Sequence, residues 1–206
     1  METMTTSIIL PFLVFFPFLG AVISYIIGRS NKGARDIWCW ILSAVIFIAS
    51  LMLIGKETVY SLRGFCGLGL SFAADGFGVI LAVLTGAIWL ITTIFSKEYM
   101  AAERNRNRYY FFVFLTLGAT MGIFLSADLF TTFIFFEIMS FTSFVLVMHD
   151  EEDFTVRSAK TYLAVAVIGG LVTLMGLFMM YQKACRFHDE EIANNILHTD
   201  NVAEIK

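Results

Sequence analysis

The sequence predicts an all-α membrane protein with about six transmembrane helices, and its composition and its pattern of apolar runs are the observations behind this prediction. Of its 206 residues, 58% are hydrophobic and 15% are charged, whereas ordinary globular domains have roughly 45–50% apolar and 25% charged residues. The mean hydropathy of +0.79 is typical of an integral membrane protein. The net charge of −3 argues against a nucleic-acid partner.

Six apolar runs are separated by polar breaks, and each is close to the roughly 20 residues that a helix needs to cross a bilayer. The predicted spans are residues 8–27, 37–54, 77–95, 109–126, 129–148 and 161–181. The first span has no basic region before it and no small-residue cleavage site after it, so we interpret it as a retained helix. Residues 182–206 are polar and acidic, and they predict a mostly solvated tail with at most a turn or two of helix.

A glycine-rich segment lies between the second and third predicted spans. Its short apolar stretches are broken by Gly64, Gly67 and Gly69. Short apolar runs interrupted by glycine are typical of strands joined by turns. The segment therefore predicts a surface hairpin or an extended loop.

Positive charges are distributed unevenly over the predicted loops. The loops after the first, third and fifth spans hold Arg29, Lys32, Arg35, Lys97, Arg104, Arg106, Arg108, Arg157 and Lys160. On the opposite side of the membrane, the chain before the C-terminal tail holds only Lys56 and Arg63. Lys and Arg accumulate in cytoplasmic loops. The odd-numbered loops are therefore predicted to be cytoplasmic, and both termini to lie on the outer side.

The fifth predicted span contains a single charged residue, Glu137. At 1.5 Å of rise per residue it lies about 12 Å into the span, near the middle of the hydrocarbon. A charge there costs at least about 2.5 kcal/mol, and intramembrane carboxylates are commonly part of ion pathways. The span therefore favours a proton or ion site, or half of a buried ion pair. The alternative is a protonated glutamate that only hydrogen-bonds between helices.

Polar residues near Glu137 leave two further alternatives open. Ser140 and Ser143 follow at one and two helical turns, where their hydroxyls could support a proton path or could bond to their own backbone. Lys160, at the entrance of the sixth span, is the candidate cation. A direct contact is not expected, because Glu137 is about 16 Å above the end of its span and a Lys side chain reaches only about 6 Å. Lys160 then either extends to the interface or links to Glu137 through water.

Small residues predict two helix-packing faces, Gly118-x-x-x-Gly122 in the fourth span and Gly169 with Gly170 in the sixth. The three cysteines form no spacing typical of metal ligands with the three histidines. We therefore expect no metal site, and no iron–sulfur or haem cofactor, because the ligand sets for both are missing.

The fifth and sixth spans also carry a family resemblance. The stretch SADLFTTFIFFEIMSFTSFVLV, followed by RSAKTYLAVAVIGGLVTLMGLFMMY, resembles the proton-conducting antiporter-like subunits of respiratory complex I, of Mrp-type sodium/proton antiporters and of group 4 hydrogenases. The stretches SFAADGFG and FSKEYM around the third span are similar to that family as well. The resemblance covers residues 72–181 well and the first two spans loosely.

The resemblance implies roles for two residues. Glu137 corresponds to the fifth-helix glutamate of the family's proton path, and Lys160 to the basic residue at the start of its sixth helix. Family members have about fourteen spans in two inverted five-helix repeats, so the resemblance covers only their N-terminal portion. It also implies other membrane subunits and lipid as partners, and a multi-pass location in a prokaryotic plasma membrane.

Two hypotheses for the function follow. The first is a membrane subunit, partial or split, of a proton- or cation-translocating complex; it would hold no redox cofactor, and any electron transfer would occur in partner subunits. The second is a non-conducting structural or assembly subunit, or a truncated remnant, of such a complex. A small solute carrier acting alone is disfavoured, because the sequence shows no second copy of the Glu-bearing span.

Overall fold

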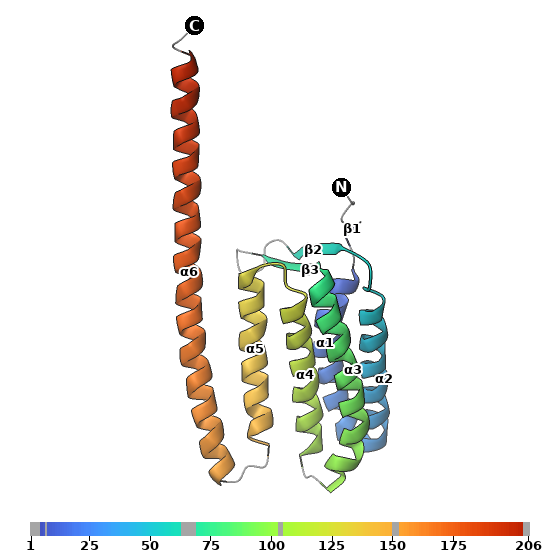
Figure 1. The fold of residues 1–206 in the computed structure, drawn as a ribbon. Helices are drawn as coiled ribbons and strands as arrows, with labels where there is room; N and C mark the ends of the chain where they lie inside the picture. Colours follow the sequence, from blue (N-terminus) through green and yellow to red (C-terminus); the bar gives the residue numbers. More distant parts are fainter. Residues whose placement is uncertain (1–4, 7, 63–68, 103–104, 150–152, 204–206) are drawn as a thin grey trace. The chain divides into compact units, whose positions relative to one another are not determined.

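The structure is a computed structural model, and it describes residues 5–6, 8–62, 69–102, 105–149 and 153–203. The elements in chain order (Figure 1) are β1 (Thr5–Thr6), α1 (Ile9–Ser30), α2 (Lys32–Leu51), β2 (Thr58–Leu62), β3 (Leu70–Ala74), α3 (Gly76–Tyr99), the short 3₁₀ helix η2 (Met100–Ala102), α4 (Arg106–Phe124), α5 (Leu129–Val147) and α6 (Asp153–Ala203). The structure confirms the predicted all-α membrane fold.

The chain divides into two compact units, residues 1–164 and 165–206. The first unit holds the helices α1–α5, the sheet and the beginning of α6. The second unit is the remainder of α6, a single helix. Each unit is described by itself.

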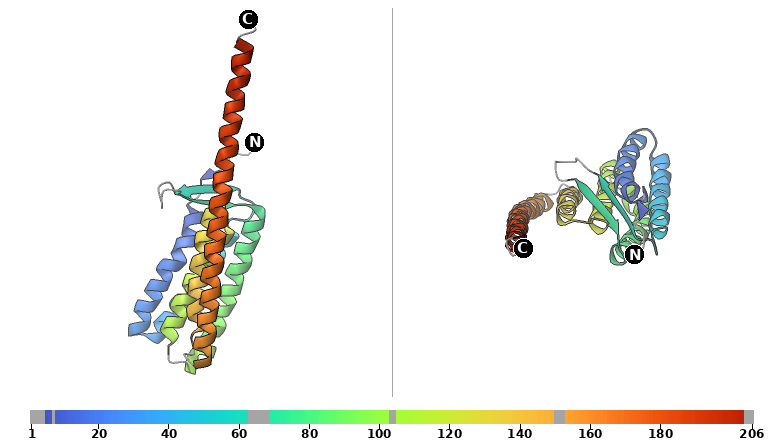
Figure 2. Two further views of the ribbon diagram at one scale, coloured as in Figure 1. Left: turned by 90° about the vertical axis from the view of Figure 1, so that its left-hand side faces the viewer. Right: turned by 90° about the horizontal axis from the view of Figure 1, so that it is seen from above.

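Five helices in the described part of the chain are long and apolar enough to cross a membrane: α1, α2, α3, α5 and residues 154–186 of α6. Helix α4 is not among them, because it opens with the polar residues Arg106, Asn107 and Arg108. Helix α4 lies among α1, α3 and α5 (Figures 1 and 2). Many of its remaining residues are buried. Since its neighbours shield it from lipid, α4 can cross the membrane with a lower hydropathy than they have.

Side-chain caps explain why three helices begin after very short turns. The Asn31 side chain accepts hydrogen bonds from the backbone N–H groups of Gly33 (2.9 Å) and Ala34 (3.2 Å) at the start of α2. Asp75 accepts from Gly78 at the start of α3, and Asp128 caps α5. Such caps satisfy backbone donors that the first turn leaves free. Because of the Asn31 cap, α2 begins at residue 32 and not at the predicted residue 37.

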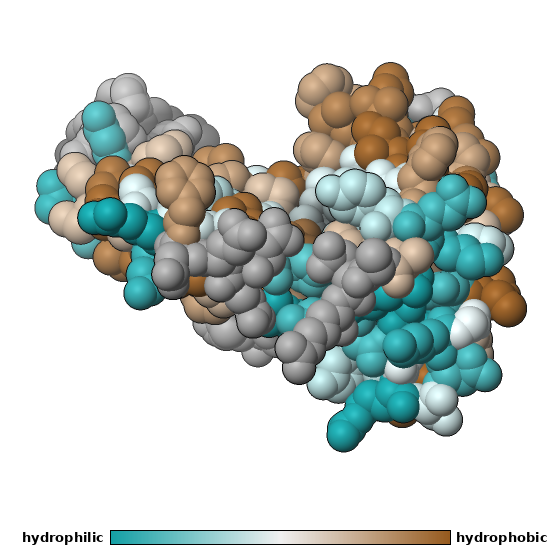
Figure 3. Space-filling model, turned by 90° about the horizontal axis from the view of Figure 1, so that it is seen from below, coloured by the Kyte–Doolittle hydropathy of each residue, from teal (hydrophilic) through white to brown (hydrophobic). Residues whose placement is uncertain are grey.

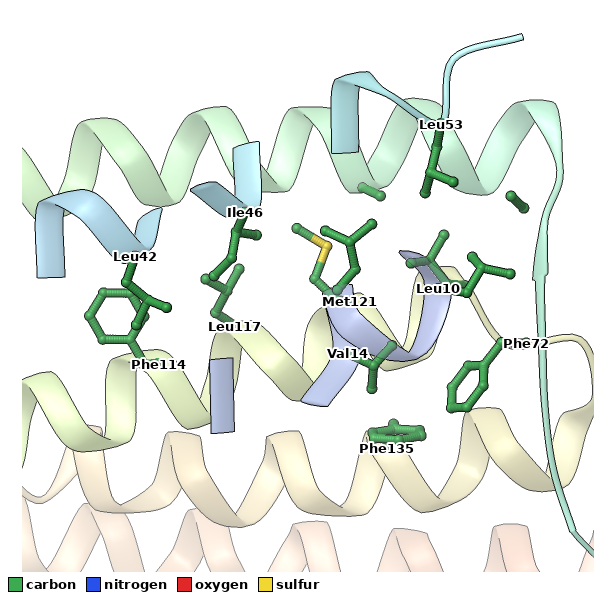
Figure 4. Close-up of a cluster of buried hydrophobic side chains, with 14 of the residues drawn as sticks. Leu10, Val14, Leu42, Ile46, Leu53, Phe72, Phe114, Leu117, Met121 and Phe135 are labelled. Atoms are coloured by element: carbon green, nitrogen blue, oxygen red, sulfur yellow. The ribbon is translucent and has the colours of Figure 1, made fainter. Parts of the chain in front are cut away.

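The bundle core is made of apolar side chains from α1, α2, α3, α4, α5 and β3, together with Leu53 just after α2 (Figure 4). Its labelled members are Leu10, Val14, Leu42, Ile46, Leu53, Phe72, Phe114, Leu117, Met121 and Phe135. Lipid is as apolar as these side chains, so close packing and hydrogen bonds, and not transfer out of water, hold membrane helices together.

A three-stranded sheet covers one end of the bundle, which we call the hairpin end. Strands β2 and β3 are antiparallel, with Tyr60 opposite Phe72, so the predicted hairpin is confirmed. Strand β1, which the sequence did not indicate, pairs in parallel with the start of β2. Strand β3 is bonded to the α4–α5 turn through Ala73 N–H to Leu125 O and Ala127 N–H to Ser71 O, both 2.8 Å.

The opposite end of the bundle carries the connections after α1, α3 and α5, and we call it the basic end. Hydrophilic residues gather there, with hydrophobic residues toward the rim (Figure 3). Arg29, Lys32, Lys97 and Glu98 are exposed at this end. The predicted cytoplasmic location of this end stays a prediction.

Helix α6 differs from the prediction at both of its ends. It begins at Asp153, before the predicted residue 161, and continues to Ala203. The prediction of at most two helical turns beyond residue 181 is wrong. The sequence after Gly176 contains neither glycine nor proline, so nothing local stops the helix.

Candidate proton-transfer site on α5

Glu137 lies near the centre of α5. It is about 12 Å from the first residue of the helix and about 15 Å from the last along the helix axis. The side chain is half-buried, and its Oε1 atom is buried without a hydrogen-bond partner among the described residues. Buried polar atoms almost always have a partner, so this exception needs an explanation, and a bound water or a catalytic role would supply one.

Three contacts define how α5 lies against α4. The ring of His149 packs edge-on against Tyr109, with 5.8 Å between centroids. The hydroxyl of Thr142 lies 3.0 Å from that of Thr116. Gly122 contacts Phe135 so closely that a Cβ atom there would overlap the ring. The two helices therefore run antiparallel with a constant register. The facing pairs are Tyr109–His149, Thr116–Thr142 and Gly122–Phe135.

This register brings Glu137 to the level of Thr120 and Met121 on α4. Thr120 donates its hydroxyl to the carbonyl oxygen of Thr116 at 2.8 Å. Glu137 itself is about 140° around α5 from Thr142, at 100° per residue, so it lies on the side of α5 that is turned away from this contact with α4. The carboxylate is thus placed where polypeptide or water outside this helix pair can reach it.

The two serines that follow Glu137 on α5 differ from the nearby threonines in their hydrogen bonds. Thr116, Thr120 and Thr142 each donate to a carbonyl oxygen of their own helix. Ser140 and Ser143 make no hydrogen bond within the described residues, so the structure gives no support to the backbone-bonded alternative. Their part in a proton path stays a prediction.

Lys160 lies in the part of α6 that belongs to the first unit. It is exposed and lies about 10 Å along the helix from Asp153. Within the described residues it forms no ion pair with Glu137. Because α6 begins earlier than predicted, Lys160 is two turns inside the helix and not at its entrance. A link between Lys160 and Glu137 through water stays a prediction.

The predicted packing glycines fall in two places. Gly118 lies against α1, where a Cβ atom would come within 2.6 Å of the ring of Phe18 and 3.0 Å of the carbonyl oxygen of Val14. Gly122 lies against α5, as described above. Gly169 and Gly170 are in the second unit, and their packing role stays a prediction.

A buried ionic network at the basic end was not predicted from the sequence. Arg35 is fully buried and donates through Nη2 to Oδ1 of Asp36 at 2.8 Å. Its Nη1 donates to the side chain of Asn107, and its guanidinium lies 4.8 Å from the ring centre of Tyr110. Arg106 donates to Oδ2 of Asp36 at 3.2 Å. Asp36 of α2 therefore bonds to Arg106 of α4, and Arg35 of α2 bonds to Asn107 of α4.

In the sequence analysis, Arg35 and Arg106 were interpreted only as loop charges that set the orientation of the chain in the membrane. The signal that could have revealed the network is Asp36, an acidic residue directly beside a basic one at the edge of an apolar run. Charges at such a position are rarely buried unless they are paired.

Comparisons with known proteins support the resemblance. Residues 126–205 match the family described as NADH:quinone oxidoreductase/Mrp antiporter, TM. The protein described as antiporter subunit mnhD2 of Staphylococcus epidermidis (strain ATCC 35984) is 28% identical over 207 residues, which cover 96% of this chain and 40% of that protein. The protein of the same description in Staphylococcus aureus (strain JH9) is 27% identical, with 92% and 39% covered.

Two solved structures share the fold. The archaeal membrane-bound sulfane sulfur reductase has a chain with a TM-score of 0.74 and 16% identity, over 82% of this chain and 36% of that one. The Mrp complex from Dietzia sp. DQ12-45-1b has a chain with a TM-score of 0.72 and 20% identity, over 81% of this chain and 18% of that one.

The fold and the half-buried carboxylate of α5 define a helical multi-pass membrane protein with a candidate ion-transfer site. The comparisons support its resemblance to the antiporter-like membrane subunits. It spans about 40% of the length of the curated relatives described above.

Proposed function

We propose that this chain is a membrane subunit, or part of one, of a proton- or cation-translocating complex, in which Glu137 takes up and releases the transferred proton. The observation that carries the proposal is the Oε1 atom of Glu137, buried in the middle of α5 without a partner among the described residues. The resemblance to subunits of antiporter complexes supports it.

The chemistry depends on the electrostatic surroundings of the carboxylate. Burial in an apolar medium favours the neutral acid, whereas a nearby cation favours the carboxylate. A cation that approaches and withdraws therefore makes a buried glutamate release and rebind one proton. Lys160 is the candidate for that cation, and water would connect the two groups.

The remainder of the machinery would come from outside the described chain. Because the curated relatives are longer, we propose that further membrane polypeptide completes the path beyond Glu137. Any redox step would take place in partner subunits. The complex would lie in a prokaryotic plasma membrane, and the conducted ion would be a proton or a metal cation exchanged for one.

Substitution of Glu137 tests this proposal. Everted membrane vesicles that contain the assembled complex with Glu137→Gln should lose proton transport, measured with a pH-sensitive dye, because the amide cannot exchange a proton. The matched control is Glu98→Gln, which changes an exposed glutamate on α3 and should leave transport unchanged. Full transport by an assembled Glu137→Gln complex would instead support the non-conducting structural subunit.

A further inference from the structure

The side chain of Arg106 lies where the ends of three helices meet at the basic end. Its Nη2 atom donates to Oδ2 of Asp36 on α2 and to the backbone carbonyl oxygen of Lys97 on α3, both at 3.2 Å. The ammonium group of Lys97 lies 4.9 Å from the ring centre of Trp40 on α2. Trp40 is fixed in turn, because its Nε1 atom donates to the carbonyl oxygen of Thr93 at 3.2 Å. We call Trp40, Lys97 and Arg106 the Lys97 cluster.

Helices α2, α3 and α4 carry more positive than negative charge at this end. Their cations there are Lys32, Arg35, Lys97, Arg106 and Arg108, and their carboxylates there are Asp36 and Glu98. Arg35 donates to Oδ1 of Asp36 and Arg106 to Oδ2, so one carboxylate serves two guanidinium groups. Glu98 is exposed and lies about 100° around α3 from Lys97. The Lys97 cluster therefore has an excess of positive charge that an anion would balance.

The start of α4 also favours an anion. Its N-cap residue, Asn105, makes no side-chain cap, whereas Asn31, Asp75 and Asp128 cap the other helices described above. The N-terminal end of a helix carries a partial positive charge, yet the first turn of α4 adds Arg106 and Arg108. The Nε atom of Arg106 is buried without a hydrogen-bond partner among the described residues. An anion at this end would offset the charge of both arginines and of the helix terminus.

Apolar side chains continue from the Lys97 cluster toward the middle of α2 and α3. Ile41 and Ile48 of α2 and Ile91 and Ile94 of α3 are each at least half exposed. Trp residues are enriched at the level of lipid headgroups, and Lys side chains extend to that level. Hydrophilic residues gather over the basic end and hydrophobic residues lie toward its rim (Figure 3). An anion at the Lys97 cluster would therefore lie beside a surface that suits acyl chains.

We propose that the Lys97 cluster binds the phosphate group of an anionic phospholipid, whose acyl chains lie along the exposed isoleucines of α2 and α3. The phosphate oxygens accept hydrogen bonds from the Lys97 ammonium and the Arg106 guanidinium, a pairing in which the charge assists the bond. A lipid such as phosphatidylglycerol keeps its negative charge. In phosphatidylcholine the trimethylammonium group cancels that charge, so the cluster should select the anionic lipid.

Tryptophan fluorescence tests the proposal, because Trp40 lies in the site. The full chain is reconstituted in phosphatidylcholine nanodiscs that contain a small fraction of phosphatidylglycerol or phosphatidylcholine with brominated acyl chains, which quench nearby tryptophans. At equal fractions, brominated phosphatidylglycerol should quench more than brominated phosphatidylcholine. The excess should disappear in Trp40→Phe, which leaves Trp38 and Trp89 in place.

Charge variants then locate the site. Lys97→Gln should lower the affinity for brominated phosphatidylglycerol relative to phosphatidylcholine by about fivefold, the usual effect of one basic residue near an anionic lipid. Lys97→Arg keeps the charge and should keep the selectivity. The matched control is Lys32→Gln, which removes an exposed cation at the same end but outside the cluster and should leave the selectivity unchanged.

Three results would overturn the inference. Equal quenching of the unmodified chain by the two brominated lipids would show that no anionic lipid is selected. Equal losses in Lys97→Gln and Lys32→Gln would show a diffuse attraction to the whole basic end in place of a site. Release of the brominated phosphatidylglycerol by millimolar inorganic phosphate would assign the cluster to a free anion. None of these outcomes depends on whether Glu137 transfers a proton.

Discussion

Arg35 donates to Asp36 at 2.8 Å with none of its own surface exposed. A guanidinium buried so completely is stabilised only while its charge is balanced, because taking it out of water costs several kcal/mol. Oδ1 of Asp36 accepts from Arg35 and Oδ2 from Arg106. One carboxylate at the junction of α2 and α4 therefore balances the charges of two arginines.

Replacement of that carboxylate should destabilise the bundle strongly. Asp36→Asn leaves the buried guanidinium of Arg35 and the partly exposed one of Arg106 without a counter-charge, and breaking a buried pair in this way costs about 3–5 kcal/mol. The loss should appear as a lower midpoint of unfolding in detergent. Glu98→Gln, an exposed acidic residue at the same end, is the control and should leave the midpoint unchanged. An unchanged midpoint in Asp36→Asn would show that the network contributes nothing.

Gly28 gives a second test of the same junction from α1. A Cβ atom at Gly28 would overlap the side chain of Asn107 and lie 2.9 Å from Cδ of Arg35. Gly28→Ala should therefore displace Arg35 and lower stability by about 1–3 kcal/mol, the usual cost of overpacking. Gly33→Ala is the matched control, because its Cβ would meet only Asn31 at 3.5 Å. Equal unfolding midpoints for the two variants would contradict the close approach.

The sequence predicted well those features that depend on local patterns. The glycines at 64, 67 and 69 indicated a hairpin, and β2 and β3 pair as one. The apolar run around Glu137 indicated a helix, and α5 places that residue near its centre. Residues 63–68 themselves, including Cys66, lie outside the described residues.

The features that the sequence did not predict depend on partners far along the chain. Burial of Arg35 requires Asn107, which is 72 residues away. The two-residue strand β1 is too short to have a pattern of its own and exists only because β2 lies beside it. Likewise the contact between Thr116 and Thr142 cannot be predicted without the register of α4 and α5, because threonines in apolar spans usually bond to their own helix.

Gly118 tests the contact between α1 and α4. Gly118→Ala places a methyl group against Phe18 and the backbone of Val14, and the backbone carbonyl cannot turn away as a side chain can. The α1–α4 contact should open, with a stability loss of about 1–3 kcal/mol in detergent unfolding. Gly76→Ala has nothing within 4 Å of its Cβ and should be neutral. Since alanine favours the helix more than glycine does, a loss of similar size in both variants would contradict the packing explanation.

Asp128 connects the hairpin end to the helix that carries Glu137. Its Oδ1 accepts from the Thr131 N–H at 2.7 Å and its Oδ2 from the Thr131 hydroxyl at 2.6 Å. The Thr131 hydroxyl oxygen in turn accepts from the Ser71 N–H of β3 at 3.1 Å. Asp128→Ala removes the cap and the acceptor that orients the Thr131 hydroxyl, so the first turn of α5 should fray at a cost of about 0.5–2 kcal/mol.

Amide hydrogen exchange of the first turn of α5 measures this effect directly, because exchange follows local opening. Exchange should accelerate there in Asp128→Ala, and less in Asp128→Asn, which keeps an acceptor oxygen. Asp75→Ala removes the equivalent cap of α3 and is the matched control. It should accelerate exchange at the start of α3 and leave α5 unchanged. If both variants loosened α5 equally, the sheet as a whole, and not the Asp128 cap, would hold the start of that helix.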